Sequence, residues 1–143
     1  MITLSDYWMG RDATHPTLMC PMLERNAGIT VECVNKLLAL AQVAGVVLEI
    51  DPVHPQYGYV ASGWRPPDIN DATANASKTS KHMLAQACDI YDPHGALDRW
   101  LMTDDGQRAL SDIGLWIEHP GKTPSWAHMQ TVPPGSGRRV FWP

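Results

Sequence analysis

The sequence predicts an α+β domain with a small, mostly antiparallel sheet and helices packed on one side of it. Helix-like segments come first along the chain, and short strand-like segments with helical excursions follow them. An order of helices first and strands afterwards favours the α+β class. A length of 143 residues suits one domain that buries its own core, so we expect a single domain over residues 1–143.

Two short helices are expected near the N-terminus. The segment LSDYWMG, residues 4–10, offers Ser5 or Asp6 as an N-cap. A second helix covers about residues 17–26 and ends before Gly28.

The strongest helical pattern is VECVNKLLALAQVAG, residues 31–45, with Thr30 as its expected N-cap and Gly45 at its C-terminal end. Its apolar side chains recur with helical period, which indicates one buried face. These side chains are Val31, Val34, Leu37, Leu38 and Ala41.

The remainder of the chain is predicted to build the sheet. Alternating or β-branched segments indicate strands at residues 46–50, 57–64, 86–91, 115–119 and 125–130, and a last short strand near the C-terminus. The polar segment 65–80 reads as a long surface loop. Residues 96–102 and 105–114 read as helical, the latter with Asp104 or Asp105 as cap.

Charge and composition argue against two classes of partner. Eleven basic residues stand against fifteen acidic ones, and the one basic pair is Arg138-Arg139, so nucleic acid is not expected. No apolar run approaches the roughly 20 residues that span a bilayer, and the N-terminus lacks the pattern of a secretory signal. We therefore expect a monomer made in the cytoplasm, without a membrane partner.

The three cysteines of the chain should be reduced thiols: Cys20, Cys33 and Cys88.

Two of the six histidines lie in or beside predicted strands, namely His82 and His128. The other four adjoin proline or a Pro/Gly turn and are expected in exposed loops: His15, His54, His94 and His119. In a strand, Asp89 would share a face with Ala85 and Ala87, and Cys88 would point away as a poor metal ligand. A buried aspartate needs a partner, which could be an arginine or a metal.

Three blocks of the sequence together resemble the M15 family of zinc peptidases. They are SGWR (62–65), SKHMLAQACD (80–89) and SWAH (125–128). This family comprises the D-alanyl-D-alanine carboxypeptidases and L-alanyl-D-glutamate endopeptidases of bacteria and their phages. The match in order and spacing covers roughly residues 28–130, and compact phage members look most similar.

The resemblance implies a zinc ion on the sheet with three ligands: His82, Asp89 and His128. Arg65 would stabilise the oxyanion that forms on the scissile carbonyl, or bind a substrate carboxylate. Ser80 and Trp126 would contact the substrate.

Two positions depart from the family pattern. The usual glycine is Ala85, which requires only a conformation that alanine tolerates. Ser125 stands where many members carry a catalytic Glu or Asp, and a serine cannot accept the proton at neutral pH. A hairpin across residues 120–124 would bring Glu118 close enough to serve as the base, with His119 as a weaker substitute.

The implied function is a zinc-dependent peptidase that cleaves peptidoglycan stem peptides, as an endolysin that another protein releases to the cell wall. Whether it acts as a carboxypeptidase or as an endopeptidase stays open. The alternative is a catalytically silent, zinc-bearing structural or binding module of a phage particle, which the serine at position 125 favours.

Overall fold

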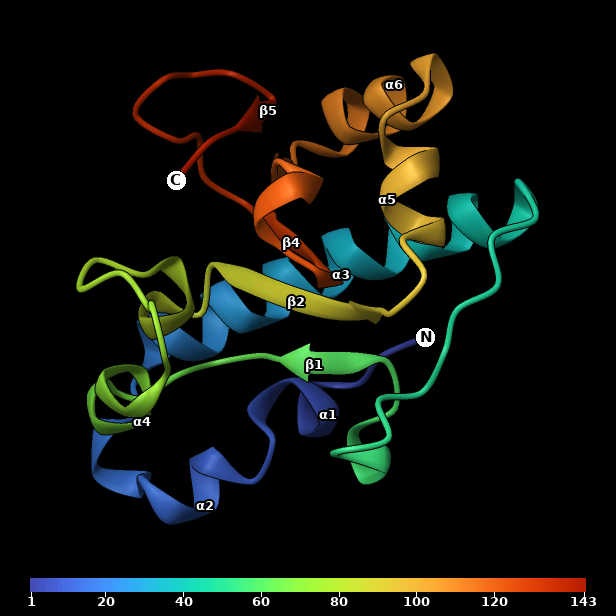
Figure 1. The fold of residues 1–143 in the computed structure, drawn as a ribbon. Helices are drawn as coiled ribbons and strands as arrows, with labels where there is room; N and C mark the ends of the chain where they lie inside the picture. Colours follow the sequence, from blue (N-terminus) through green and yellow to red (C-terminus); the bar gives the residue numbers. More distant parts are fainter.

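One mixed, five-stranded sheet forms the centre of the computed structural model, which describes residues 1–143 (Figure 1). The strand order is β1-β2-β4-β3-β5, and only the β3–β5 pair is parallel. The strands are β1 (Val60–Ser62), β2 (Ala87–Asp92), β3 (Trp116–Glu118), β4 (Ser125–Gln130) and β5 (Val140–Phe141). The predicted α+β class with a mostly antiparallel sheet is therefore confirmed.

Six α-helices and four 3₁₀ helices surround the sheet. The α-helices are α1 (Leu4–Trp8), α2 (Arg11–Thr14), α3 (Pro21–Val43), α4 (Pro67–Ala72), α5 (Ala96–Leu101) and α6 (Asp104–Ile113). The 3₁₀ helices are η1 (Pro16–Leu18), η2 (Pro55–Tyr57), η3 (Lys81–Leu84) and η4 (Pro120–Lys122). Figure 1 shows α3 running behind β2 and β4 along the length of the sheet.

The core lies between α3 and one face of the central strands. The apolar stripe of α3 is buried as predicted, and Cys88 and Ile90 of β2 join it in one hydrophobic cluster with Ala127 and Met129 of β4. Because side chains alternate along a strand, the residues between these positions face away from the core. That alternation directs Asp89 and His128 to the opposite face of the sheet.

The two helices predicted around Gly28 are one continuous helix, α3, and the predicted break was wrong. The helix begins at Pro21, a favourable first position, and buries Leu23 and Ala27 before the predicted stripe starts. Thr30 does not act as a cap, because its hydroxyl donates to the carbonyl of Ala85 (2.9 Å). Packing thus outweighs the roughly 1 kcal/mol that a helix-interior glycine costs.

Two other predicted segments differ in the structure. Residues 46–50 form no strand, because no neighbouring strand pairs with them and Val47 and Ile50 are exposed. The predicted loop 65–80 contains helix α4, which starts with Pro67 at its first position.

Two predicted helix caps were also wrong. Thr3 caps α1, and Asp6 instead completes a capping box by accepting from the Thr3 backbone N–H (2.7 Å). Thr103 caps α6 through its hydroxyl.

Candidate metal centre

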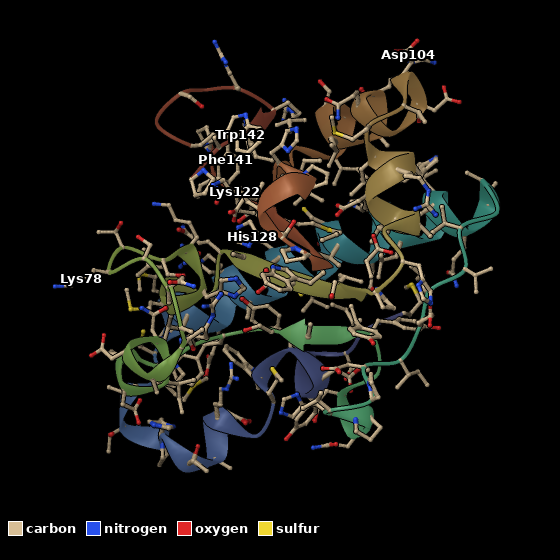
Figure 2. All side chains as sticks on the ribbon, viewed as in Figure 1. Lys78, Asp104, Lys122, His128, Phe141 and Trp142 are labelled. Atoms are coloured by element: carbon tan, nitrogen blue, oxygen red, sulfur yellow. The ribbon has the colours of Figure 1, made fainter.

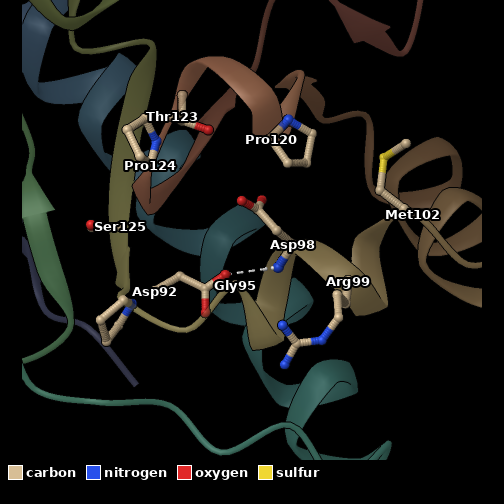
Figure 3. A pocket seen from close by; sticks show the side chains of 10 residues that line it. Asp92, Gly95, Asp98, Arg99, Met102, Pro120, Thr123, Pro124 and Ser125 are labelled. Carbon is tan, nitrogen blue, oxygen red and sulfur yellow. Dashed lines mark hydrogen bonds between the residues drawn. The ribbon is translucent and has the colours of Figure 1, made fainter.

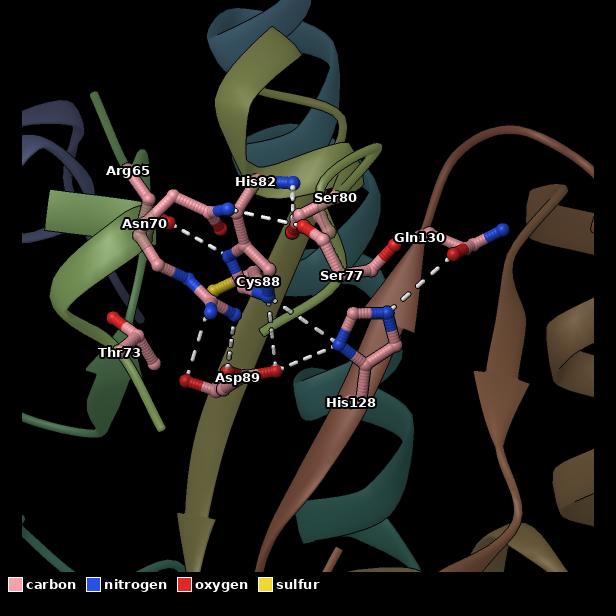
Figure 4. A network of polar contacts seen from close by, with 12 residues as sticks. Arg65, Asn70, Thr73, Ser77, Ser80, His82, Cys88, Asp89, His128 and Gln130 are labelled. Atoms are coloured by element: carbon pink, nitrogen blue, oxygen red, sulfur yellow. Dashed lines mark hydrogen bonds and ion pairs between the residues drawn. The ribbon is translucent and has the colours of Figure 1, made fainter. Parts of the chain in front are cut away.

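The three residues expected to bind metal come together on the open face of the sheet (Figure 4). Asp89 on β2 and His128 on β4 are direct cross-strand partners. His82 reaches the same point from η3, the 3₁₀ helix that precedes β2. Their ligand atoms all lie within 4.8 Å of one another, so this group could hold a metal ion.

The turn that carries His82 is fixed at both of its ends. At the start of η3, the hydroxyl of Ser80 accepts from the backbone N–H of His82 (3.3 Å). At the end, Ala85 adopts a left-handed conformation with φ of 55°. Such a conformation favours glycine, and a non-glycine residue tolerates it at a cost of about 1–2 kcal/mol.

The spacing of the three ligand atoms suits a tetrahedral ion. Asp89 Oδ1 lies 2.8 Å from His128 Nδ1 and 3.2 Å from His82 Nε2, and the two ring nitrogens are 3.4 Å apart. Ligand atoms at tetrahedral zinc distances are about 3.3 Å apart. A metal ion would therefore need little rearrangement of these side chains.

Hydrogen bonds on the far side of each ring orient the nitrogens that face the metal position. His82 Nδ1 donates to the carbonyl of Gly63 (2.7 Å), which leaves the lone pair of Nε2 free. The Nε2 of His128 lies 3.4 Å from the side-chain oxygen of Gln130. The amide nitrogen of Gln130 donates to the carbonyl of Val132 (2.7 Å), so its oxygen is the end that accepts from His128. Outer partners of this kind orient metal-binding histidines.

The two neighbouring imidazoles favour an ionised Asp89 in spite of its burial. Burial by itself would raise the pKa of Asp89, but the adjacent His82 and the hydrogen bond with His128 lower it below its ordinary value. Burial lowers the pKa of His82. For His128, burial opposes and the hydrogen bond to Asp89 raises the pKa. Two imidazole nitrogens and an ionised carboxylate thus converge on one point. There Nδ1 of His128 and Oδ1 of Asp89, 2.8 Å apart, share a proton that a bound metal ion would replace.

A cavity of about 860 Å³ opens in front of this centre. Arg65 lies on one side of it and contacts the second carboxylate oxygen of Asp89 (3.4 Å), while its buried Nε has no partner. The cavity is also lined by Ser80, by Trp126 and by the C-terminal residues Phe141 and Trp142. Figure 2 shows Phe141 and Trp142 on the same side of the molecule as His128.

Glu118 lines the same cavity, as the predicted β3–β4 hairpin requires. Trp116 pairs with Gln130 and Ile117 with Met129, so the register continues with Glu118 opposite His128. Burial raises the pKa of Glu118 above its ordinary value, which makes this carboxylate a better proton acceptor near neutral pH.

The other residues considered from the sequence lie away from the centre. Ser125 is exposed at the start of β4 and does not line the metal cavity. His119 stacks on Trp142 with ring centroids 4.0 Å apart. None of the four loop histidines is buried.

Sequence reasoning did not assign a role to Gly63 or Gln130, which orient the two histidines. The signal for Gln130 was its place two residues after His128, on the same face of the strand. Gly63 acts through its backbone carbonyl, which no sequence pattern identifies.

Comparisons with protein-family models, with curated proteins and with solved structures found no match to this chain. Its helices also include none that is long and apolar enough to cross a bilayer.

Proposed function

We propose that this protein is a zinc-dependent peptidase that cleaves peptidoglycan stem peptides. The observation that carries the proposal is the convergence of two imidazole nitrogens on a buried carboxylate, with an outer hydrogen-bond partner for each ring. The three-block resemblance to M15 peptidases, with these residues in the ligand positions, supplies the substrate class.

Zinc fits the donors better than the harder cations do. Two imidazole nitrogens and one carboxylate oxygen suit zinc, and three protein ligands with an open fourth position are typical of catalytic zinc sites. The same donor set also occurs with ferrous iron, so metal analysis belongs to the test. When bound, zinc would supply Lewis acidity to a water molecule and to the scissile carbonyl.

The side chains of the cavity have distinct roles in this proposal. Glu118 accepts the proton of the attacking water and passes it to the leaving amine. Arg65, opposite the carboxylate of Asp89, donates to the oxyanion that develops on the carbonyl. Ser80 and Trp126 contact the peptide on either side of the reacting bond.

The test is the conservative variant Glu118→Gln, which keeps the shape of the side chain and removes its basic oxygen. Zinc content, measured by elemental analysis that also reports iron, should stay at one ion per chain. Release of new amino groups from purified peptidoglycan should fall about 10²- to 10⁴-fold, the usual contribution of a general base. Ser125→Ala is the matched control and should keep nearly full activity. An equally active Glu118→Gln enzyme would rule out this base.

A second candidate is a catalytically silent, zinc-bearing module of a phage particle. The observation in its favour is that the family's usual base position holds Ser125, which is exposed and outside the cavity. A parent protein that binds zinc fully and releases no amino groups from any wall peptide would favour this candidate over the peptidase.

A further inference from the structure

A second cavity of about 500 Å³ lies at the other end of the β2–β4 pair (Figure 3). It is bounded by the start of α5, by η4 and by the start of β4. Asp92 pairs with Ser125 at this end of the sheet, three residues along from the Asp89–His128 pair. Three residue steps along a strand correspond to about 10 Å. Because this spacing is odd, the side chains of Asp92 and Ser125 point to the other face of the sheet from those of Asp89 and His128. The two cavities meet at Thr123, which lines both of them.

Two polar side chains that point into this second cavity have no partner. Asp98 is only 7% exposed, and no donor of the protein reaches its carboxylate. Thr123 is 2% exposed, and its buried hydroxyl oxygen has no hydrogen-bond partner. Figure 3 shows both groups directed toward the space between Thr123 and Pro120. Burying such groups without partners is costly, so a ligand that donates hydrogen bonds would relieve that cost.

The neighbouring charges do not satisfy Asp98. Both carboxylate oxygens of Asp92 are already used, since they accept from the backbone N–H groups of Leu97 (3.1 Å) and Asp98 (2.9 Å). The guanidinium of Arg99 donates to the carbonyl of His94 (2.6 Å) and makes no ion pair with Asp98. Burial and the proximity of Asp92 raise the pKa of Asp98 to about 7. The protein thus provides no cation beside this carboxyl group, and a cationic ligand would stabilise its ionised form.

The walls of the second cavity are mainly apolar. Four lining residues offer aliphatic or thioether surface around the carboxylate: Pro93, Met102, Pro120 and Pro124. An aliphatic chain would pack against this surface while a terminal donor reaches Asp98 and Thr123. A primary ammonium on a short methylene chain combines both properties.

We propose that the second cavity binds the side-chain ammonium of a basic residue in the peptide substrate. This inference rests on the proposed peptidase function. An extended peptide covers about 10 Å in roughly three residues. The basic residue would thus lie at least three residues from the bond at the metal centre, and its ammonium would donate to Asp98 and Thr123.

The test compares two wall-type peptides that differ only at the basic residue, one with lysine and one with norleucine. The parent should cleave the lysine peptide with a kcat/KM about 10- to 100-fold higher, as expected for a hydrogen-bonded charge. Asp98→Asn should remove this preference by weakening cleavage of the lysine peptide alone. Asp105→Asn, which changes an exposed acid on α6, should leave the preference intact. A parent that cleaves both peptides equally well would overturn the proposal.

A binding measurement separates this inference from the proposed function. N-acetyl-lysine amide, titrated into the zinc-loaded protein, should shift the NMR signals of the Asp98 and Thr123 amides in a saturable way. N-acetyl-norleucine amide should not, and Asp98→Asn should abolish the effect. If neither peptide is cleaved but lysine amide binds as described, the peptidase proposal fails and the ammonium site stands. If both amides give the same shifts, the site assignment is wrong whatever the activity.

Discussion

Replacement of Gln130 by leucine should weaken zinc binding although this residue touches no metal. Its amide oxygen faces the Nε2 of His128 at 3.4 Å, and its nitrogen is anchored on the carbonyl of Val132 at 2.7 Å. Leucine has a similar volume but no acceptor, so the Nε2–H of His128 would lose its outer hydrogen bond when a metal is bound at Nδ1. The ring would then be held less firmly in the orientation that metal binding requires.

The size of the effect follows from the kind of contact that is lost. Outer-shell partners of metal-binding histidines contribute about 10- to 100-fold in affinity, which is roughly 1.4–2.7 kcal/mol. Loss of the bond to Val132 should also reduce the free energy of unfolding of the metal-free protein by about 1 kcal/mol. The two effects can be distinguished, because the first appears only in the zinc titration.

Competition with a chromophoric chelator measures the zinc dissociation constant of the parent and the variant. Thr131→Val is the matched control, since Thr131 is the next residue and its hydroxyl contacts the carbonyl of Gln86 (3.3 Å). It should change zinc affinity little. An unchanged zinc affinity in Gln130→Leu, or an equal loss in Thr131→Val, would refute the view that Gln130 orients His128 for the metal.

Three further predictions concern the remainder of the chain. Titration of the denatured, unreduced protein should find three thiols, because all three cysteines are free; a count of one would mean a disulfide. The folded state keeps the proton of Asp98 up to about pH 7, whereas the unfolded state releases it near 3.8, so stability falls between these values as pH rises. Asp98→Asn should remove this fall and be more stable than the parent at pH 8 but not at pH 3.5, in urea denaturation. The difference should be well below the roughly 4 kcal/mol of the full pKa shift, because solvent in the cavity screens the carboxylate. Gly28→Ala, whose added Cβ meets nothing within 4 Å, should raise the melting temperature through about 1 kcal/mol of helix propensity, while Gly63→Ala, whose Cβ would lie 1.8 Å from the carbonyl oxygen of Tyr7, should fold poorly.

Strand alternation is the part of the site that the sequence determines most directly. Once residues 86–91 and 125–130 are read as strands, a period of two puts Asp89 and His128 on the faces opposite to Cys88 and Met129. The hairpin across residues 120–124 then follows from two adjacent strands with a short turn, and it brings Glu118 to His128. These inferences depend on local patterns only, which is why they agree with the structure.

Features that depend on tertiary contacts could not be predicted from local sequence patterns. The break expected at Gly28 relied on local propensity, whereas the packing of Leu23 and Ala27 extends α3 through the glycine. The segment 46–50 has the composition of a strand but lacks a neighbour to pair with. The unpartnered hydroxyl of Thr123 becomes visible only when η4 and α5 are placed side by side.

Backbone conformations that are unusual for their residue types occur next to the candidate metal centre. Four residues other than glycine have positive φ, and two of them bound the segments that carry the histidines. Ala85 (φ 55°) ends the turn that presents His82, and Ser125 (φ 77°) begins the strand that presents His128. Each such conformation costs about 1–3 kcal/mol and persists only where the surrounding structure imposes it. A buried Asp89 between two imidazoles adds a further cost unless a cation is present. Strained backbone on both sides of a buried carboxylate and two imidazoles is hard to explain by stability alone, and it is what a preorganised metal site requires.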